Sequence, residues 1–151
     1  MSLVARTEAL LRNVWENADE NALHSMFTPD ARIYGLEDLE MMGPTEFAAF
    51  HRMITRQFIN IRIGEVAGIE QGQRVALSFR VEARDATRNR AVGVSAFLMA
   101  RYDGDRISEG RNFLDLLTLF EQAGRLPPRT RDMCLLGHDM KLSPRNTRHA
   151  H

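Results

Sequence analysis

The spacing of the apolar residues changes once along this chain of 151 residues, near Phe58. Before that point they recur every three or four positions, which is the period of a helix packed on one side. The longest such series is Phe47, Phe50, His51, Ile54 and Phe58. After it, apolar and polar residues alternate, which is the period of a strand with one buried face. The chain therefore predicts helices first and an antiparallel sheet after them.

Local start and stop signals divide these two regions into elements. Helices are expected at residues 3–16, 19–26 and 44–58, and the second must end before Thr28-Pro29 because a residue that precedes proline avoids the helical conformation. Strands are expected at residues 31–35, 61–71, 75–81, 91–102 and 106–113, followed by a last helix at residues 115–123. The predicted fold class is α+β, with helices covering one face of a curved antiparallel sheet.

Composition excludes several classes of function. Lysine and arginine together number 20, as do aspartate and glutamate, so the chain lacks the basic surplus that non-specific nucleic-acid binding requires. The single cysteine, Cys134, cannot form an internal disulfide, and no cysteines and histidines have metal-ligand spacing. The glycines spell neither a phosphate loop nor a dinucleotide fingerprint. We therefore expect no metal, no cofactor and no nucleic-acid partner.

The two ends of the chain differ in character. The first 15 residues interleave Arg6, Glu8 and Arg12 with apolar residues, which argues against a signal peptide or membrane span. The lone cysteine favours the reducing cytoplasm. From Arg125 onward six residues are basic and two are acidic, a formal charge of +4. We expect one domain at residues 1–128 and a basic extension at residues 129–151, partly docked and disordered over its last few residues.

Two stretches of the chain resemble a known family. They are GPTEFAAFHRMITRQFINIRIGEVAGIEQGQRVALSFRVEA and MARYDGDRISEGRNFLDLLTLFEQAGRLP. The second contains a D-G-x-x-I-x-E turn and strand, an aspartate six residues after the glutamate, and a leucine-rich helix ending in Gly-Arg-Leu-Pro. Over residues 4–128 the chain resembles the nuclear-transport-factor-two-like superfamily, and within it the SnoaL-like polyketide cyclase and ester cyclase group. The resemblance implies a cone-shaped curved sheet wrapped around N-terminal helices, an enclosed apolar pocket and often a homodimer.

Asp115 is the first candidate for a catalytic residue. It lies between Leu114 and Leu116, and a carboxyl in apolar surroundings has a raised pKa that suits a general acid or base. The resemblance implies the same, because the aspartate at this motif position transfers the proton in SnoaL-like cyclases. The alternative is that Asp115 only caps the last helix.

Arg80 and Glu82 are two residues apart on one strand, so they share a face with Ser78. With Asp115 they resemble the catalytic set of limonene epoxide hydrolases, although Glu82 replaces an aspartate and Leu36 stands where an asparagine would follow the tyrosine. The alternative is an ordinary surface ion pair. We expect this polar face to line the pocket and the opposite apolar face, which holds Val75, Leu77, Phe79 and Val81, to be buried by a second subunit.

Other residues are candidates for contacts with a substrate. His51 stands in an apolar helical stripe, where a histidine is more often a hydrogen-bonded core residue. No histidine occupies residues 97–101, where the family's cyclases use one, and Arg101, Glu109, Arg111 and Asn112 suit a solvated face better than a pocket rim. The predicted substrate-binding residues are Trp15, Tyr34, His51, Ser78, Phe97 and Met99.

Three functions fit these residues. The first is a cofactor-independent cyclase or isomerase, in which Asp115 moves a proton on a small apolar or carbonyl-containing substrate and Arg80 stabilises the developing enolate. The second is epoxide hydrolysis by Arg80, Glu82 and Asp115. The third is a non-catalytic homodimeric module that binds a small molecule.

Overall fold

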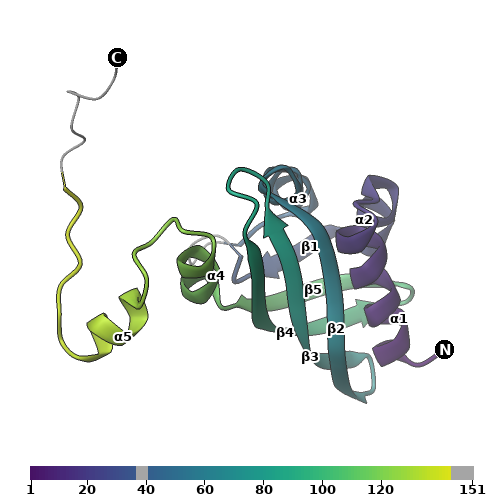
Figure 1. The fold of residues 1–151 in the computed structure, drawn as a ribbon. Coiled ribbons are helices and arrows are strands. Elements are labelled where there is room, and N and C mark those ends of the chain that lie inside the picture. The colour runs from purple at the N-terminus through teal and green to yellow at the C-terminus, as the bar shows by residue number, and fades with distance from the viewer. Residues whose placement is uncertain (37–40, 144–151) are drawn as a thin grey trace.

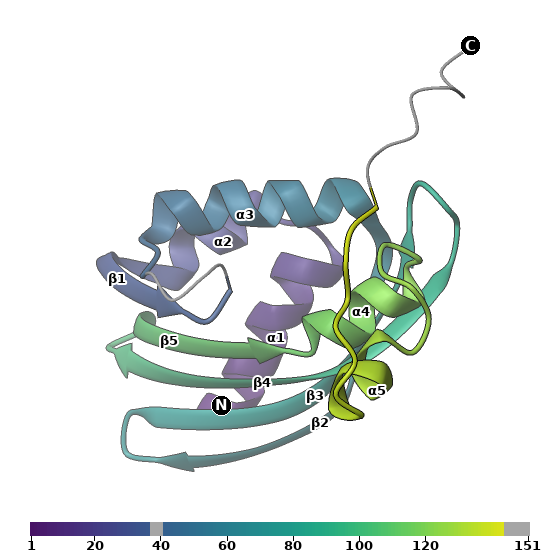
Figure 2. The ribbon, with the colours of Figure 1, turned by 90° about the vertical axis from the view of Figure 1, so that its left-hand side faces the viewer.

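The computed structural model describes residues 1–36 and 41–143, which form one mixed sheet with helices on its concave side (Figures 1 and 2). The strand order is β1-β5-β4-β3-β2, and β1 and β2 are the two open edges. The strands are β1 (Phe27–Tyr34), β2 (Phe58–Gln71), β3 (Arg74–Asp85), β4 (Ala91–Asp103) and β5 (Arg106–Leu114). The expected α+β class is confirmed, and the curved sheet does not close into a barrel.

Helices occupy the concave side and one end of this sheet. They are α1 (Leu3–Leu11), the π-helical turn η1 (Arg12–Glu16), α2 (Glu20–Met26), α3 (Pro44–Gln57), α4 (Leu116–Gln122) and α5 (Thr130–Leu135). Figure 2 shows α3 crossing above the sheet, with α4 and α5 at the end where the strands β2 and β3 curve upward. No helix in residues 1–36 and 41–143 is long and apolar enough to cross a membrane. A cytoplasmic location stays a prediction.

Two expected helix starts, at Asp19 and Pro44, are confirmed, and Ser2 adds a cap that was not expected. The Ser2 side chain accepts the backbone N–H of Ala5 at the start of α1, and Asp19 caps α2 through two backbone N–H groups. Pro44 stands in the first turn of α3, where its missing N–H costs nothing. The first helix differs from the expectation because its last turn widens into η1.

The sheet departs from a pure antiparallel arrangement at β1. Strands β2 to β5 pair antiparallel, but β1 pairs parallel to β5. The register of β1 shifts between Phe27 and Arg32, around Pro29, which has no backbone N–H to donate. Helix α3 supplies the long crossover that carries the chain from β1 to the opposite edge of the sheet, where β2 begins.

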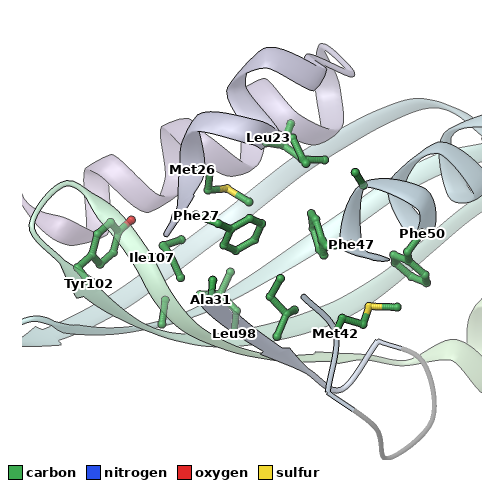
Figure 3. Close-up of a cluster of buried hydrophobic side chains, with 14 of the residues drawn as sticks. Leu23, Met26, Phe27, Ala31, Met42, Phe47, Phe50, Leu98, Tyr102 and Ile107 are labelled. Carbon is green, nitrogen blue, oxygen red and sulfur yellow. The ribbon is translucent and has the colours of Figure 1, made fainter. Parts of the chain in front are cut away.

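The core lies between the helices and the inner face of the sheet. Figure 3 shows Phe27 and Phe47 facing each other in this core, and their ring centroids are 5.1 Å apart in an edge-to-face arrangement. Val75 and Leu77 of β3 are buried in the same cluster, whereas Arg80 lies on the opposite face of the strand. The expectation that the polar face of β3 is the inner one is therefore wrong. The helices themselves cover the apolar face, so no second subunit is needed to bury it.

A buried ion pair fastens the segment after α4 to the sheet. Arg125 Nη2 lies 3.0 Å from Oδ2 of the fully buried Asp85 at the end of β3. The backbone N–H groups of Arg88 and Thr87 also donate to Asp85. The Arg88 N–H, the Arg125 guanidinium and the Thr87 N–H together hold the pKa of Asp85 below its ordinary value, although burial acts in the opposite direction.

The C-terminal extension contacts the domain through α5. The backbone N–H of Arg131 donates to Glu121 Oε1 at 2.6 Å, and its guanidinium donates to Thr118 Oγ1 at 3.0 Å. The apolar side chains of Leu135, Leu136 and Leu142 are exposed. The extension stays a predicted unit, and the expected disorder of its last few residues falls outside the described residues.

Candidate functional site

A cavity of about 140 Å³ lies between the helices and the inner face of the sheet. Its wall is formed by α1, η1, α2, α3 and α4 together with residues of all five strands. Aromatic and aliphatic side chains such as Trp15, Phe79 and Leu98 make up most of this wall. None of the lining residues, all of which belong to the described ranges, has an ionisable side chain. The cavity therefore offers an apolar, uncharged surface.

Only three of the lining residues carry a side-chain N–H or O–H group: Thr7, Trp15 and Asn112. The Thr7 hydroxyl donates to the carbonyl of Leu3 at 2.7 Å, so the Tyr102 hydroxyl at 2.7 Å donates to it in turn. Both Thr7 and Tyr102 are thereby satisfied within the protein. Burial raises the pKa of the Tyr102 phenol and favours its neutral form, which suits it as the donor.

Asn112 is held in the wall by a tight approach of two chain segments. It lies opposite Leu98 in the register of β4 and β5, and its side-chain N–H donates to the carbonyl of Tyr34 at 3.4 Å. Gly35 follows with a φ of +89°, and a Cβ at Gly35 would overlap the carbonyl oxygen of Asn112. Glycine is therefore required where the chain leaves β1 beside β5.

Asp115 does not line the cavity. It caps α4, where its carboxylate accepts the backbone N–H of Thr118 at 3.1 Å and the Thr118 hydroxyl at 2.7 Å. These two hydrogen bonds hold the pKa of Asp115 below its ordinary value, and Arg131 at 3.9 Å acts in the same direction. The side chain is 42% exposed. The expectation of a raised pKa in apolar surroundings is wrong, because local capping satisfies the ionised form.

Arg80 and Glu82 lie on the outer face of β3, away from the cavity. Arg80 Nε donates to Glu82 Oε1 at 3.4 Å, and both side chains contact solvent. Ser78 shares this face and does not line the cavity either. The structure therefore does not bring Arg80, Glu82 and Asp115 together around an apolar pocket. Their catalytic role stays a prediction, and this arrangement does not support it.

His51 is buried in the core beside the cavity wall. The carbonyl of Val14 is an acceptor, so His51 Nε2 at 2.6 Å carries the hydrogen and donates it. The imidazole also packs against Trp15, with ring centroids 4.9 Å apart. Because Val14 and Trp15 belong to η1, His51 fixes the widened turn that presents Trp15 to the cavity. A direct contact between His51 and a substrate stays a prediction.

The remaining predicted contacts divide between the two faces of the sheet. Trp15 lines the cavity. Phe97 and Met99 border it, but alternation with the buried Ala96 and Leu98 turns their side chains to the outer face, where they are 59% and 56% exposed. Tyr34 of β1 does not line the cavity, and its ring lies under the guanidinium of Arg111 on β5. A role for these residues in binding stays a prediction.

Asn112 was not expected in the cavity, since the sequence favours a solvated face for it. The residues two positions before and after Asn112 could have indicated its direction, because Gly110 and Leu114 are uncharged and share its face of β5. Both also line the cavity. No group of three or more histidine, cysteine, aspartate or glutamate residues is placed to hold a metal ion within the described ranges. The expected lack of a cofactor stays a prediction.

The chain matches one family in sequence and several solved structures in fold. The sequence model of the family described as SnoaL-like polyketide cyclase matches residues 5–123. IdmH from Streptomyces antibioticus, provisionally described as a polyketide cyclase, superposes with a TM-score of 0.72 at 18% identity, covering 82% of this chain and 99% of that chain. AclR from Streptomyces galilaeus, provisionally described as a hydroxylase, gives a TM-score of 0.72 at 17% identity, covering 90% and 91%.

A third similar structure comes from Catenulispora acidiphila. It is a protein with a ketosteroid isomerase-like fold, crystallised with trimethylamine, and it gives a TM-score of 0.70 at 14% identity, covering 82% of this chain and 94% of that chain. No curated protein matches this chain in sequence. At these identities the solved structures establish a shared fold.

Proposed function

The chain belongs to the SnoaL-like polyketide cyclase family, and within that family we propose that it binds a small, largely apolar molecule in the cavity between the helices and the sheet. The observation that carries this proposal is the wall itself, which is almost entirely hydrocarbon and has no ionisable side chain among the described residues. A preformed apolar cavity with a few polar groups is the usual form of a small-molecule site.

The size of the cavity limits the ligand. An engineered apolar cavity of about 150 Å³ stays dry and binds benzene. A cavity of about 140 Å³ therefore suits a molecule of one ring, or one ring of a larger molecule that opens the site on binding. Drug-sized ligands usually occupy pockets of about 300–1,000 Å³.

Trp15 gives a direct test of this proposal. It is the single tryptophan of the chain and it lines the cavity, so all of the tryptophan emission comes from the cavity wall. Titration with methylcyclohexane, which does not absorb where tryptophan is excited, is expected to change that emission saturably. Calorimetry on the Trp15→Phe variant is the control for binding without the reporter. The proposal is wrong if neither method detects binding.

The family's name suggests a second candidate, catalysis of ring closure or isomerisation on a carbonyl-containing substrate. What favours it is the position of Asp115, directly after the cavity-lining Leu114 at the end of β5. Its lowered pKa makes it a weak base, so this candidate requires the cap at Thr118 to open when substrate binds. Asp115→Asn should then abolish turnover of an identified substrate, whereas Asp132→Asn in α5 should not. Full turnover by Asp115→Asn would exclude the role.

We also propose that the outer face of the sheet forms a homodimer. Phe97, Met99 and Phe113 are 59%, 56% and 77% exposed there, and Phe97 lies directly opposite Phe113 in the register of β4 and β5. An exposed apolar patch of this kind is typical of an interface. These three residues are called the outer patch below.

Arginines beside the outer patch determine how such a dimer responds to salt. Arg74 and Arg101 lie opposite each other on β3 and β4, and Arg101, Arg111 and Arg32 all contact the single carboxylate of Glu109. Two copies stacked face to face bring these like charges close together, so salt should strengthen the dimer by screening them.

Sedimentation at low and high sodium chloride tests this arrangement. A dimer that tightens with salt is expected, and Phe113→Asp should disrupt it. Met53→Asp is the control, because Met53 is 42% exposed on α3, on the other side of the sheet from the outer patch. A monomer at all salt concentrations, or equal disruption by both variants, would count against the outer patch as the interface.

A further inference from the structure

We propose that the amide of Asn112 is the polar contact that orients the bound ligand, and that this ligand presents an acceptor oxygen such as a ketone carbonyl. This inference rests on the proposed binding of a small apolar molecule in the cavity, and it adds that the molecule has an oxygen that accepts a hydrogen bond. It follows from the position of Asn112, from its unused hydrogen-bonding capacity and from the space beside it.

The position of Asn112 is set by the register of the sheet. In β5 the residues that face inward alternate with those that face outward, and Asn112 lies opposite the buried Leu98 of β4. Arg111 and Phe113, its neighbours in sequence, are exposed on the outer face. Asn112 thus lines the cavity as an amide set among hydrocarbon side chains.

The hydrogen-bonding capacity of this amide is only partly used. A primary amide has two N–H donors and an oxygen that can accept two hydrogen bonds. Among the described residues, Asn112 has one contact, from Nδ2 to the carbonyl of Tyr34 at 3.4 Å. Because that partner is an acceptor, the nitrogen must be the atom on its side. One N–H and the amide oxygen are left for a ligand.

Thr7 cannot fill the same role. Its hydroxyl donates to Leu3 and accepts from Tyr102, so a ligand would have to displace a hydrogen bond within the protein. Within residues 1–36 and 41–143, a ligand oxygen at the second N–H of Asn112 displaces no hydrogen bond. A donor in low-dielectric surroundings also gains more from an acceptor than it does in water.

Gly110 leaves room beside the amide. It lies two residues before Asn112, on the same face of β5, and it lines the cavity as well. A Cβ placed on Gly110 would lie 3.9 Å from Nδ2 of Asn112, so a larger side chain would occupy the space along that nitrogen. The glycine therefore keeps the amide accessible from the cavity.

Two ligands of equal shape test this inference. Cyclohexanone and methylenecyclohexane have the same ring, and an oxygen in the first replaces a CH₂ group in the second. The measurement is the ratio of their affinities, by calorimetry, for the wild-type protein and for Asn112→Leu, which keeps the approximate volume and removes the amide. We expect the preference for the ketone to fall about tenfold in the variant, equivalent to about 1.4 kcal/mol.

Two further variants make the result specific. Asn21→Leu is the matched control, since it makes the same substitution at an exposed position of α2 and should leave the ratio unchanged. Trp15→Phe removes the indole N–H, which is the other N–H group among the lining side chains, and should also leave the ratio unchanged. Thermal unfolding of each variant verifies that it is folded.

The outcomes separate this inference from the proposed function. If the wild-type protein binds both ligands and Asn112→Leu keeps the same ratio, the role of Asn112 is wrong and binding in the cavity stands. If Trp15→Phe lowers the ratio and Asn112→Leu does not, the role of Asn112 is also wrong. If the wild-type protein binds neither ligand, the inference and the proposed function fail together.

Discussion

Filling the cavity should stabilise the protein while it abolishes binding. Ala96 of β4 is 3% exposed and lines the cavity. Ala96→Leu adds three carbon atoms, and each buried methylene group contributes about 0.8 kcal/mol, so a full fit would add up to about 2.4 kcal/mol. Imperfect packing reduces this gain, and we expect about 1 to 2 kcal/mol. For a chain of this length that is a rise in Tm of about 3–7 °C.

The same substitution at a filled position is the control. Ala31 of β1 is also 3% exposed, belongs to the buried core and does not line the cavity. Extra methylene groups in a packed core cost about 1–3 kcal/mol, so Ala31→Leu should lower Tm. Both variants add the same three carbon atoms, but of the two alanines only Ala96 lines the cavity.

Urea and thermal unfolding measure the stability of both variants, and calorimetry with methylenecyclohexane measures their binding. The account predicts that Ala96→Leu is more stable than the wild-type protein and does not bind. The reasoning is refuted if Ala96→Leu is destabilised as much as Ala31→Leu, because the space beside Ala96 would then be filled already.

Three further predictions concern residues that hold the site in place. Gly35→Ala should lower the free energy of unfolding in urea by about 2 kcal/mol or more, because the cost of a left-handed φ and the cost of the clash with β5 add together. Gly72→Ala is the control, with a φ of +59° and open space around it, and should cost only about 1 kcal/mol. Because the pKa of Asp85 is lowered in the folded state, its ionised carboxylate stabilises the fold fully above about pH 4, and this stabilisation is lost as the pH falls through the folded-state pKa. In Asp85→Asn the free energy of unfolding should therefore fall less steeply at acid pH. An unchanged acid dependence would contradict this. Tyr102→Phe should cost about 1 kcal/mol in thermal unfolding, because Thr7 keeps its other hydrogen bond; a loss several times larger would argue against that pairing.

The elements could be predicted from the sequence because their signals are local. Asp19, Pro44 and Gly72 act within a few residues of their own positions, and each marks a boundary that the structure contains. The resemblance to the SnoaL-like group added the curved sheet and its helices, and the fold and family matches agree with it. The parallel pairing of β1 with β5 joins residues about 80 positions apart, and no local pattern specifies it.

The candidate site was harder to predict because it depends on which face of each strand turns inward. Alternation along β3 distinguishes an apolar face from a polar one, but only packing against α1 and α3 decides that the polar face with Arg80 and Glu82 is the outer one. Asp115 was ambiguous for a different reason. A carboxylate before a helix can cap the helix or act as a catalytic acid or base. In the structure Asp115 caps α4, because it accepts two hydrogen bonds from Thr118, three residues later.

The central claim is that the cavity between the helices and the inner face of the sheet receives an apolar ligand. Crystals of the protein pressurised with xenon test it most directly, because xenon enters dry apolar cavities without needing a polar contact. We expect a xenon site among Trp15, Phe79 and Leu98, on the inner face of the sheet. An empty cavity, with xenon bound only at the outer patch, would contradict it.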